Sequence, residues 1–148
     1  ELDYVRWLAG DVCQIACFAG HISDLEIETE DVAEILLQFE SGAIGNVHMD
    51  YVQRSPSRTC QIIGEEGTIA WDYYANKVLL FETRQPSWQV FRQEGFERNE
   101  MFVAEMQHFL ACLEGRETPV VDVEEGAKIL RLALAARESA KTGKVCDL

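Results

Sequence analysis

The chain has 148 residues, of which 47% are hydrophobic and 26% charged, so it is long enough for one globular domain with a sizeable core. Its formal net charge of −13 makes nucleic acids and anionic membrane surfaces poor partners, and no apolar run approaches the length of a membrane-spanning helix. The five cysteines are odd in number and irregularly spaced, which favours free thiols in the cytoplasm over a disulfide framework.

The first ten residues predict a short helix. Leu2, Val5 and Leu8 are spaced as on one helical face, and Gly10 can end the last turn. A helix of this length is marginal by itself, and the chain starts without a methionine. We therefore expect the helix to continue upstream of residue 1.

Six or seven strands are expected next, because runs of alternating polarity are separated by turn signals. The clearest pair forms a hairpin around Ser41-Gly42, and the acidic segment 20–30 connects this hairpin to the strand before it. The strands are expected at residues 12–19, 31–40, 43–54, 59–63, 68–73, 77–83 and 88–93. Further turns are expected at residues 64–67, 75–76 and 85–87. The sheet should therefore be open and mainly antiparallel.

The last third of the sequence predicts two helices. Apolar residues recur at helical spacing over residues 98–114, and Gly115 can stop that helix. Asp122 and Glu125 form a capping box, worth about 1 kcal/mol, at the start of the second helix. One face of this second helix carries Val123, Ala127, Leu130 and Leu134. Strands in a block followed by helices indicate an α+β fold with the helices packed on one face of the sheet.

The other face of the sheet is expected to mediate self-association. Several strands carry apolar side chains there, namely Val32, Leu36, Ile44 and Val52. A half-apolar open face favours burial against a second copy of the chain. We expect a dimer or tetramer.

Neither candidate for a metal site fits a known pattern. The segment from His21 to Asp31 is rich in carboxylates, but it lacks the ligand positions and the glycine of a calcium loop. We interpret it as a solvated acidic connection. Cys13 and Cys17 share one strand face without the CxxC spacing of a zinc site, so no metal is expected.

Two histidines lie outside the acidic segment, and one of them, His48, is a candidate for acid–base chemistry. His48 and Asp50 share one face of a strand and offer an acid–base pair, although no nucleophile is visible to complete a catalytic site. A surface hydrogen bond or an interface contact is the favoured interpretation. His108, beside Phe109 on the first long helix, is interpreted as a boundary residue.

A pair of arginines marks the strongest candidate for ligand binding. Arg54 and Arg58 flank the loop 55–57 at the end of a strand, where functional residues are common. The planar guanidinium group suits carboxylate or phosphate groups. The alternative is pairing with nearby Glu65 and Glu66.

Arg98 and Asn99 form a second, weaker candidate at the start of the first long helix. The free N–H groups of a helix start attract anions, so these residues could face a ligand. A simple N-cap role for Asn99 is the favoured interpretation.

Four segments in order carry a family resemblance: ELDYVRWLAG, ETEDVAEILLQFESGAIGNVHMDYVQR, CQIIGEEGTIAWD and FVAEMQHFLACLEGRETPVVDVEEGAKILRLALAARESAKTGK. Together they resemble the glucose–fructose oxidoreductase / inositol dehydrogenase (Gfo/Idh/MocA) family over essentially the whole chain. The resemblance implies that residues 1–148 are a single C-terminal domain for substrate binding and oligomerisation. Its open sheet would be like that of dihydrodipicolinate reductase and unlike ferredoxin reductase.

The resemblance also implies a preceding Rossmann domain that binds NAD or NADP. The chain itself lacks any G-x-G pair, since its closest glycines are three residues apart. Family members oxidise or reduce a hydroxyl group on a sugar, polyol or nucleotide sugar. The family's Glu-Lys-Pro motif has no match here, and the histidine of its Asp-x-Gly-x-His motif would lie just before Glu1. No catalytic residue and no cofactor binding are therefore expected in this chain, which should be inactive alone.

The resemblance also implies that residues of this chain line one side of the substrate site. It places Arg54 and Arg58 near the substrate with Tyr51 behind them, and Arg98 and Asn99 are weaker candidates. Arginines at this loop would suit an anionic substrate such as a uronic acid, a sialic-acid-like sugar or a sugar nucleotide. The alternative is a non-catalytic α+β domain that dimerises or senses a ligand.

Overall fold

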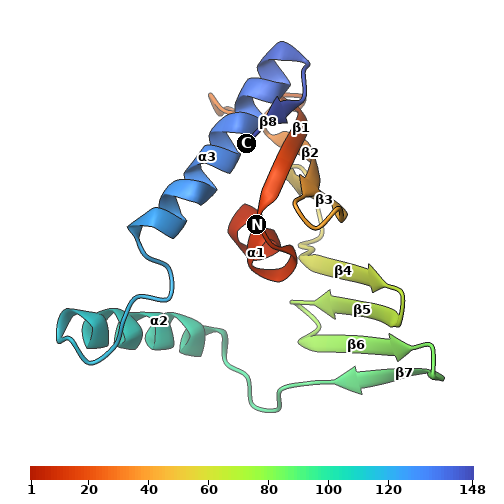
Figure 1. Cartoon of the computed structure of the whole chain (residues 1–148), viewed down its shortest axis with the longest axis vertical. Coiled ribbons are helices and arrows are strands. Elements are labelled where there is room, and N and C mark those ends of the chain that lie inside the picture. The colour runs from red at the N-terminus through yellow and green to blue at the C-terminus, as the bar shows by residue number, and fades with distance from the viewer. The chain divides into compact units, whose positions relative to one another are not determined.

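The computed structural model describes residues 1–148, and the chain forms two compact units (Figure 1). Unit 1 comprises Glu1–Val52 and Val120–Leu148, and unit 2 comprises Gln53–Pro119. Unit 1 holds sheet A, with strand order β3-β2-β1-β8, and unit 2 holds sheet B, with order β4-β5-β6-β7. All neighbouring strands are antiparallel, which confirms the α+β class and the strand orientation. The expected sheet of six or seven strands is instead eight strands in two sheets.

Unit 1 contains two helices and the four strands of sheet A. Their bounds are Leu2–Ala9 for α1, Val12–Gly20 for β1, Val32–Phe39 for β2, Ile44–Asp50 for β3, Val123–Thr142 for α3 and Cys146–Asp147 for β8. Strand β8 has only two residues, too few to show alternation in the sequence, and its Cys146 pairs with Ile15 of β1. Strand β3 ends four residues earlier than expected, and the chain then leaves sheet A.

The core of unit 1 lies between sheet A and α3, which runs beside β1 in Figure 1. Ile15 of β1 stands opposite Leu37 of β2, and both side chains are almost completely buried. Leu132 and Ala136 of α3 pack against this layer. Each fully buried side chain of leucine size contributes about 1.5–3 kcal/mol, so this layer is the main source of stability in the unit.

The face of α3 that packs on the sheet differs from the apolar face identified in the sequence. Val123, Leu130 and Leu134 are 88%, 60% and 54% exposed, whereas Leu132 and Ala136 are each 5% exposed. The helix is rich in alanine and leucine all round, so its sequence offers more than one apolar stripe. The stripe with the smaller side chains lies against β1, where it allows close approach of helix and strand.

Ser139 of α3 supplies a hydrogen bond that the short β8 does not. Its buried hydroxyl group accepts a hydrogen bond from the backbone N–H of Cys17 at 2.9 Å and donates one to the carbonyl oxygen of Lys144 at 2.6 Å. A buried backbone N–H without a partner costs about 1–3 kcal/mol. Ser139 therefore provides an acceptor for the backbone N–H of Cys17, which lies beyond the residues of β1 that pair with β8.

Only one of the two hydrogen bonds of the expected capping box forms at the start of α3. The carboxylate of Asp122 accepts from the backbone N–H of Glu125 at 2.9 Å, as expected. The carboxylate of Glu125 instead binds Arg6 of α1 and Lys128. These hydrogen bonds, that from Arg6 first, lower the pKa of Glu125 to about 2. The side chain expected to close the cap links the two helices of unit 1.

Unit 2 contains sheet B and one helix. The bounds are Thr59–Gly64 for β4, Gly67–Asp72 for β5, Lys77–Glu82 for β6, Gln85–Phe91 for β7 and Arg98–Leu113 for α2. The turn expected at residues 85–87 lies earlier, at residues 83–84, so that Pro86 belongs to β7. Because β7 is an edge strand, the missing N–H of a proline is tolerated there.

Helix α2 has the expected length but leaves its apolar side chains exposed. It ends at Leu113, and Gly115 follows with a φ of 72°. Phe102, Phe109 and Leu113 are each more than half exposed, and Ala111 is the buried residue of the helix. The expected packing of both long helices on a sheet is therefore found for α3 in unit 1, while α2 presents its apolar stripe on the surface.

Candidate functional site

The basic loop follows β3 and precedes β4. Arg54 and the loop residues 55–57 are exposed, and the side-chain amide of Gln53 donates a hydrogen bond to the carbonyl oxygen of Ser55 at 2.8 Å. Tyr51 is 72% exposed and belongs to unit 1, whereas Arg54 belongs to unit 2. The loop therefore presents a guanidinium group to solvent, where a carboxylate or phosphate group can reach it.

Arg58 stands at the end of this loop against aromatic rings of sheet B. Its guanidinium carbon lies 5.8 Å from the ring centroid of Trp71 and 5.4 Å from that of Tyr73. The two rings pack edge to face, with centroids 6.0 Å apart. Cation–π contacts of this kind hold the guanidinium group of an arginine in place against the aromatic rings. The sequence indicated Arg58 through its place in the loop, but it held no signal for the aromatic side chains beside it.

Glu66, one of the two glutamates considered as alternative partners of these arginines, lies beside a different arginine. Its carboxylate lies 3.6 Å from the guanidinium group of Arg84, across the β4–β5 and β6–β7 turns. Both side chains are almost fully exposed, so this ion pair is worth little.

Arg98 and Asn99 lie in the first turn of α2, and both are exposed. The N-cap of α2 is Glu97, whose side chain makes no capping hydrogen bond, so the interpretation of Asn99 as the N-cap is wrong. The helix starts two residues earlier than an N-cap at Asn99 would place it. Arg98 and Asn99 are therefore part of the first turn of α2, where the backbone N–H groups of a helix start are found.

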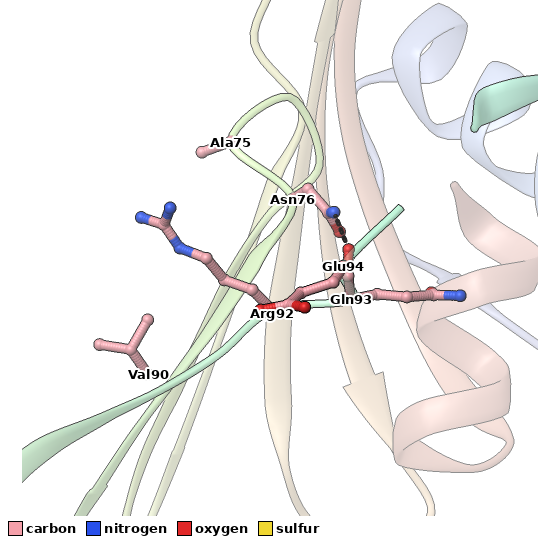
Figure 2. Close-up of a pocket in the computed structure, with 6 residues that line it drawn as sticks. All are labelled: Ala75, Asn76, Val90, Arg92, Gln93 and Glu94. Atoms are coloured by element: carbon pink, nitrogen blue, oxygen red, sulfur yellow. Dashed lines mark hydrogen bonds between the residues drawn. The ribbon is translucent and has the colours of Figure 1, made fainter. Parts of the chain in front are cut away.

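A shallow hollow of about 530 Å³ lies at one edge of sheet B. Figure 2 shows the lining residues Ala75, Asn76, Val90, Arg92, Gln93 and Glu94. The side-chain amide of Asn76 donates a hydrogen bond to the carbonyl oxygen of Gln93 at 2.8 Å and thereby ties the β5–β6 turn to the segment after β7. Arg92 extends away from this bond in Figure 2. The sequence held no signal for the hollow, because its residues meet only through the strand pairing.

His48 lies between two carboxylates on the outer face of sheet A. Its Nε2 atom is 2.8 Å from Asp50 Oδ2, which confirms the favoured surface hydrogen bond, and its Nδ1 atom is 2.6 Å from Glu34 Oε1. Glu34 stands directly opposite His48 in the β2–β3 register. The hydrogen bonds from Glu34 and then Asp50 raise the pKa of His48 and favour its charged form. An imidazole held in this way joins two carboxylates of neighbouring strands and is not free to act as a base.

Asp31 departs from the interpretation of its segment as a solvated connection. The side chain is buried, and its carboxylate accepts hydrogen bonds from the backbone N–H groups of Ile22 and Ser23 at 2.8 and 2.9 Å and from the Ser23 hydroxyl group at 2.5 Å. The Ser23 hydroxyl group is the largest cause of a lowered pKa for Asp31. Asp31 is thus a structural anchor of residues 20–31, while the other acidic residues there are exposed.

No group of three or more histidine, cysteine, aspartate or glutamate side chains is arranged to hold a metal ion. None of the three helices combines the length and the apolar character needed to cross a bilayer.

The fold thus defines an α+β domain built on open antiparallel sheets, with a basic loop and aromatic side chains at one end of sheet B. The sequence profile described as "Oxidoreductase family, C-terminal alpha/beta domain" matches residues 1–148. The chain therefore belongs to the Gfo/Idh/MocA oxidoreductase family, as its C-terminal α/β domain, which confirms the resemblance found in the sequence.

Two curated relatives and one solved structure show what the chain is similar to. D-apiose dehydrogenase of Paraburkholderia graminis is 30% identical over 99% of this chain and 42% of the relative. The NAD(+)-dependent scyllo-inositol 2-dehydrogenase of Bacillus subtilis is 26% identical over 100% of this chain and 45% of the relative. An oxidoreductase from Agrobacterium radiobacter, solved with NAD+, L-tartaric acid and magnesium, shares the fold with a TM-score of 0.82 and 24% identity, over 99% of this chain and 46% of that one. The chain spans less than half the length of these proteins.

Proposed function

We propose that residues 1–148 serve as the C-terminal part of an NAD(P)-dependent oxidoreductase that acts on a hydroxyl group of a sugar, polyol or nucleotide sugar. The observation that carries this proposal is the family match over the whole chain. It is supported by the two curated relatives, which are dehydrogenases of an apiose sugar and an inositol. The part proposed for this chain is a wall of the substrate site and an oligomer interface.

The residues of this chain do not fit a nicotinamide dinucleotide. Dinucleotide sites of the Rossmann type need parallel strands joined through a helix and a glycine-rich turn at the helix start. Here every strand pair is antiparallel, and no glycines occur in G-x-G spacing. The cofactor is therefore assigned to a part of the protein outside these residues, and the chain alone should not turn over.

The proposed substrate contacts are Arg54, Arg58, Tyr51, Arg98 and Asn99. Exposure of Arg54 and Tyr51 and of the first turn of α2 supports this assignment. The cation–π contacts of Arg58 support a guanidinium group of fixed orientation. Since Arg54 and Arg58 both present cations, the preferred substrate carries a carboxylate or phosphate group.

The proposed oligomer interface is the outer face of sheet A. Phe18, Leu36 and Ile44 are 81%, 54% and 74% exposed on three neighbouring strands, while Val32 and Val52 are half-buried. Burial of such a face against a second copy is favourable by about 25 cal/mol for each Å² of apolar surface. Light scattering at micromolar concentration should give the mass of a dimer or tetramer, and a monomer at high concentration would contradict this interface.

The substrate assignment is tested in the longest natural protein that contains this chain. Reduction of NAD+ and NADP+ is measured with a panel of neutral sugars, polyols, uronic acids and sugar nucleotides. Arg54→Ala should lower kcat/KM for an anionic substrate by about tenfold to a hundredfold, because a charge-assisted hydrogen bond is lost. Turnover of a neutral polyol should change little.

Arg84→Ala is the matched control, because Arg84 is an exposed arginine of unit 2 that pairs with Glu66. It should leave the kinetics unchanged. Equal kinetics of wild type and Arg54→Ala with every active substrate would remove Arg54 from the site. No reduction of either cofactor across the panel would contradict the oxidoreductase proposal and favour a ligand-sensing domain, and turnover by residues 1–148 alone would contradict the assignment of the cofactor site.

A further inference from the structure

A cysteine, a histidine and a glutamate are joined by contacts near the C-terminal end of α2. The Sγ atom of Cys112 lies 3.6 Å from Nε2 of His108, and Nδ1 of His108 lies 2.6 Å from Oε2 of Glu117. Cys112 and His108 are four residues apart and therefore share one face of the helix. The interpretation of His108 as a mere boundary residue overlooked this arrangement, because Glu117 comes from the chain beyond the helix.

The turn after α2 brings Glu117 back to the helix. Gly115 takes the left-handed conformation, with a φ of 72° that other residues rarely adopt. The backbone N–H groups of Arg116 and Glu117 then both donate to the carbonyl oxygen of Ala111, at 2.9 and 3.3 Å. These bonds fold the chain over the end of α2, so that the Glu117 carboxylate is placed by the backbone beside His108.

The order of the three groups fixes the direction in which a proton can move. An ionised carboxylate only accepts hydrogen bonds, so Nδ1 of His108 carries the hydrogen toward Glu117. The lone pair of Nε2 then faces the thiol of Cys112. A nucleophile, a base and a carboxylate that orients the base are the arrangement by which a thiol is activated.

The geometry also argues against a shared metal ion. The thiol and the carboxylate contact opposite nitrogens of the imidazole ring, so the three donor groups do not converge on one point. This agrees with the finding that no such group of side chains can hold a metal ion.

Two of the three groups border a hollow, and the third, Cys112, is partly exposed. His108 and Glu117 line an open hollow of about 560 Å³ together with residues of α2 and Arg116. The side chains of His108 and Glu117 are 33% and 52% exposed, and Cys112 is half-buried. The charge of Arg116 is paired with Glu114 at 2.7 Å, so the hollow has no strong net charge of its own beside the ring.

We propose that Cys112 is a thiol-modification site that reacts with low-molecular-weight disulfides, with His108 as its base and Glu117 as the residue that orients the base. Nε2 of His108 takes the proton of the Cys112 thiol. The thiolate attacks one sulfur of the disulfide, whose S–S bond breaks as the mixed disulfide forms, and the departing thiolate takes the proton from the imidazolium. The Cys112 sulfur is oxidised and the departing sulfur is reduced, so the disulfide is the only oxidant required.

The test compares cysteines within one sample of the 148-residue chain. The chain is incubated at neutral pH with hydroxyethyl disulfide, a small uncharged disulfide, and the rate of mixed-disulfide formation at each cysteine is followed by peptide mass spectrometry. Cys13 is the internal reference, because it is also half-buried but its Sγ donates to the carbonyl oxygen of Gln38. Cys112 should react at least about tenfold faster than Cys13, since an unassisted thiol at neutral pH is only a few per cent thiolate.

His108→Gln should lower the rate at Cys112 by about tenfold and leave the rate at Cys13 unchanged, and added imidazole should restore part of the loss. Glu117→Gln should lower it less, because the ring remains but is no longer oriented by a charge. Equal rates at Cys112 and Cys13 in the wild-type chain overturn the proposal whether or not the variants fold. An unchanged rate at Cys112 in His108→Gln also overturns it, because exposure alone would then explain the reactivity.

Discussion

Units 1 and 2 each hold a four-stranded antiparallel sheet, yet only unit 1 builds a buried core around it. Nine of the ten buried hydrophobic residues belong to unit 1, and Ala111 is the one in unit 2. In unit 1, α3 covers one face of sheet A, so Ile35, Leu37 and Phe39 on alternate positions of β2 are buried. In unit 2, the residues of β5 and β6 are mostly half-buried on both faces. Strand pairing alone thus makes a sheet, and a covering layer is what turns one of its faces into a core.

The largest expected effect tests the core of unit 1. Leu37→Ala should lower the free energy of unfolding by about 2–5 kcal/mol, because it leaves a cavity where a completely buried side chain packs. Leu36→Ala is the matched control, compared at a protein concentration at which light scattering gives the monomer, since this neighbour on the same strand is 54% exposed on the opposite face, and there it should cost less than about 1 kcal/mol. Urea unfolding measures both. Equal losses would show that the two faces of sheet A are equally covered in solution.

A smaller effect tests the strand pairing on which unit 2 relies. A Cβ atom on Gly67 would stand 2.1 Å from the carbonyl oxygen of Phe81 on the neighbouring strand β6. Since that atom belongs to the backbone, β5 and β6 must separate locally, and Gly67→Ala should cost about 1–3 kcal/mol. Amide hydrogen exchange should speed up along β5 and β6 and stay unchanged in sheet A.

Gly64→Ala is the control for this substitution, because Gly64 stands opposite Gly67 in the β4–β5 register and its added Cβ would meet its nearest neighbour at an ordinary 3.9 Å. The control should leave exchange in β5 and β6 as in the wild type. If both variants exchange alike, the close approach at Gly67 does not limit the stability of sheet B.

The sequence predicted the elements well where apolar residues recur over a long segment, at every second position for a strand or about every 3.6 positions for a helix. The hairpin around Ser41-Gly42 and the span of α2 are examples, because alternation and helical spacing are local properties. What it could not decide was which side of an element is covered. The apolar face chosen on α3 was wrong, since a helix rich in alanine and leucine has several equivalent stripes and only the partner strand selects one.

The candidate site shows the same limit. The shared strand face of His48 and Asp50 was predictable from their spacing, and the register of the hairpin also places Glu34 there. The contact of Arg58 with Trp71 depends on the pairing of β4 with β5, which brings together residues far apart in the sequence. The Glu117–His108 contact depends on a turn whose direction a single glycine sets.

The smallest expected effect concerns acid stability and the loop of unit 1. The Ser23 hydroxyl group, followed by the backbone N–H groups of Ile22 and Ser23, lowers the pKa of Asp31 against the opposing effect of burial. A lowered pKa in the folded state means that Asp31 contributes stability above its unfolded-state pKa of about 3.9 and loses that contribution as the pH falls through the lower folded-state value. Asp31→Asn keeps the shape but does not titrate, so its free energy of unfolding should depend less on pH below about pH 4.

Asp24→Asn in the same connection is the control, because Asp24 is exposed. Urea unfolding over a series of acidic pH values should give the wild-type pH dependence for Asp24→Asn and a flatter one for Asp31→Asn. Identical slopes for all three proteins would mean that the anchoring of residues 20–31 by Asp31 does not persist in the folded state in solution. The layer between sheet A and α3 would then be the contribution that remains, and the comparison of Leu37→Ala with Leu36→Ala measures it separately.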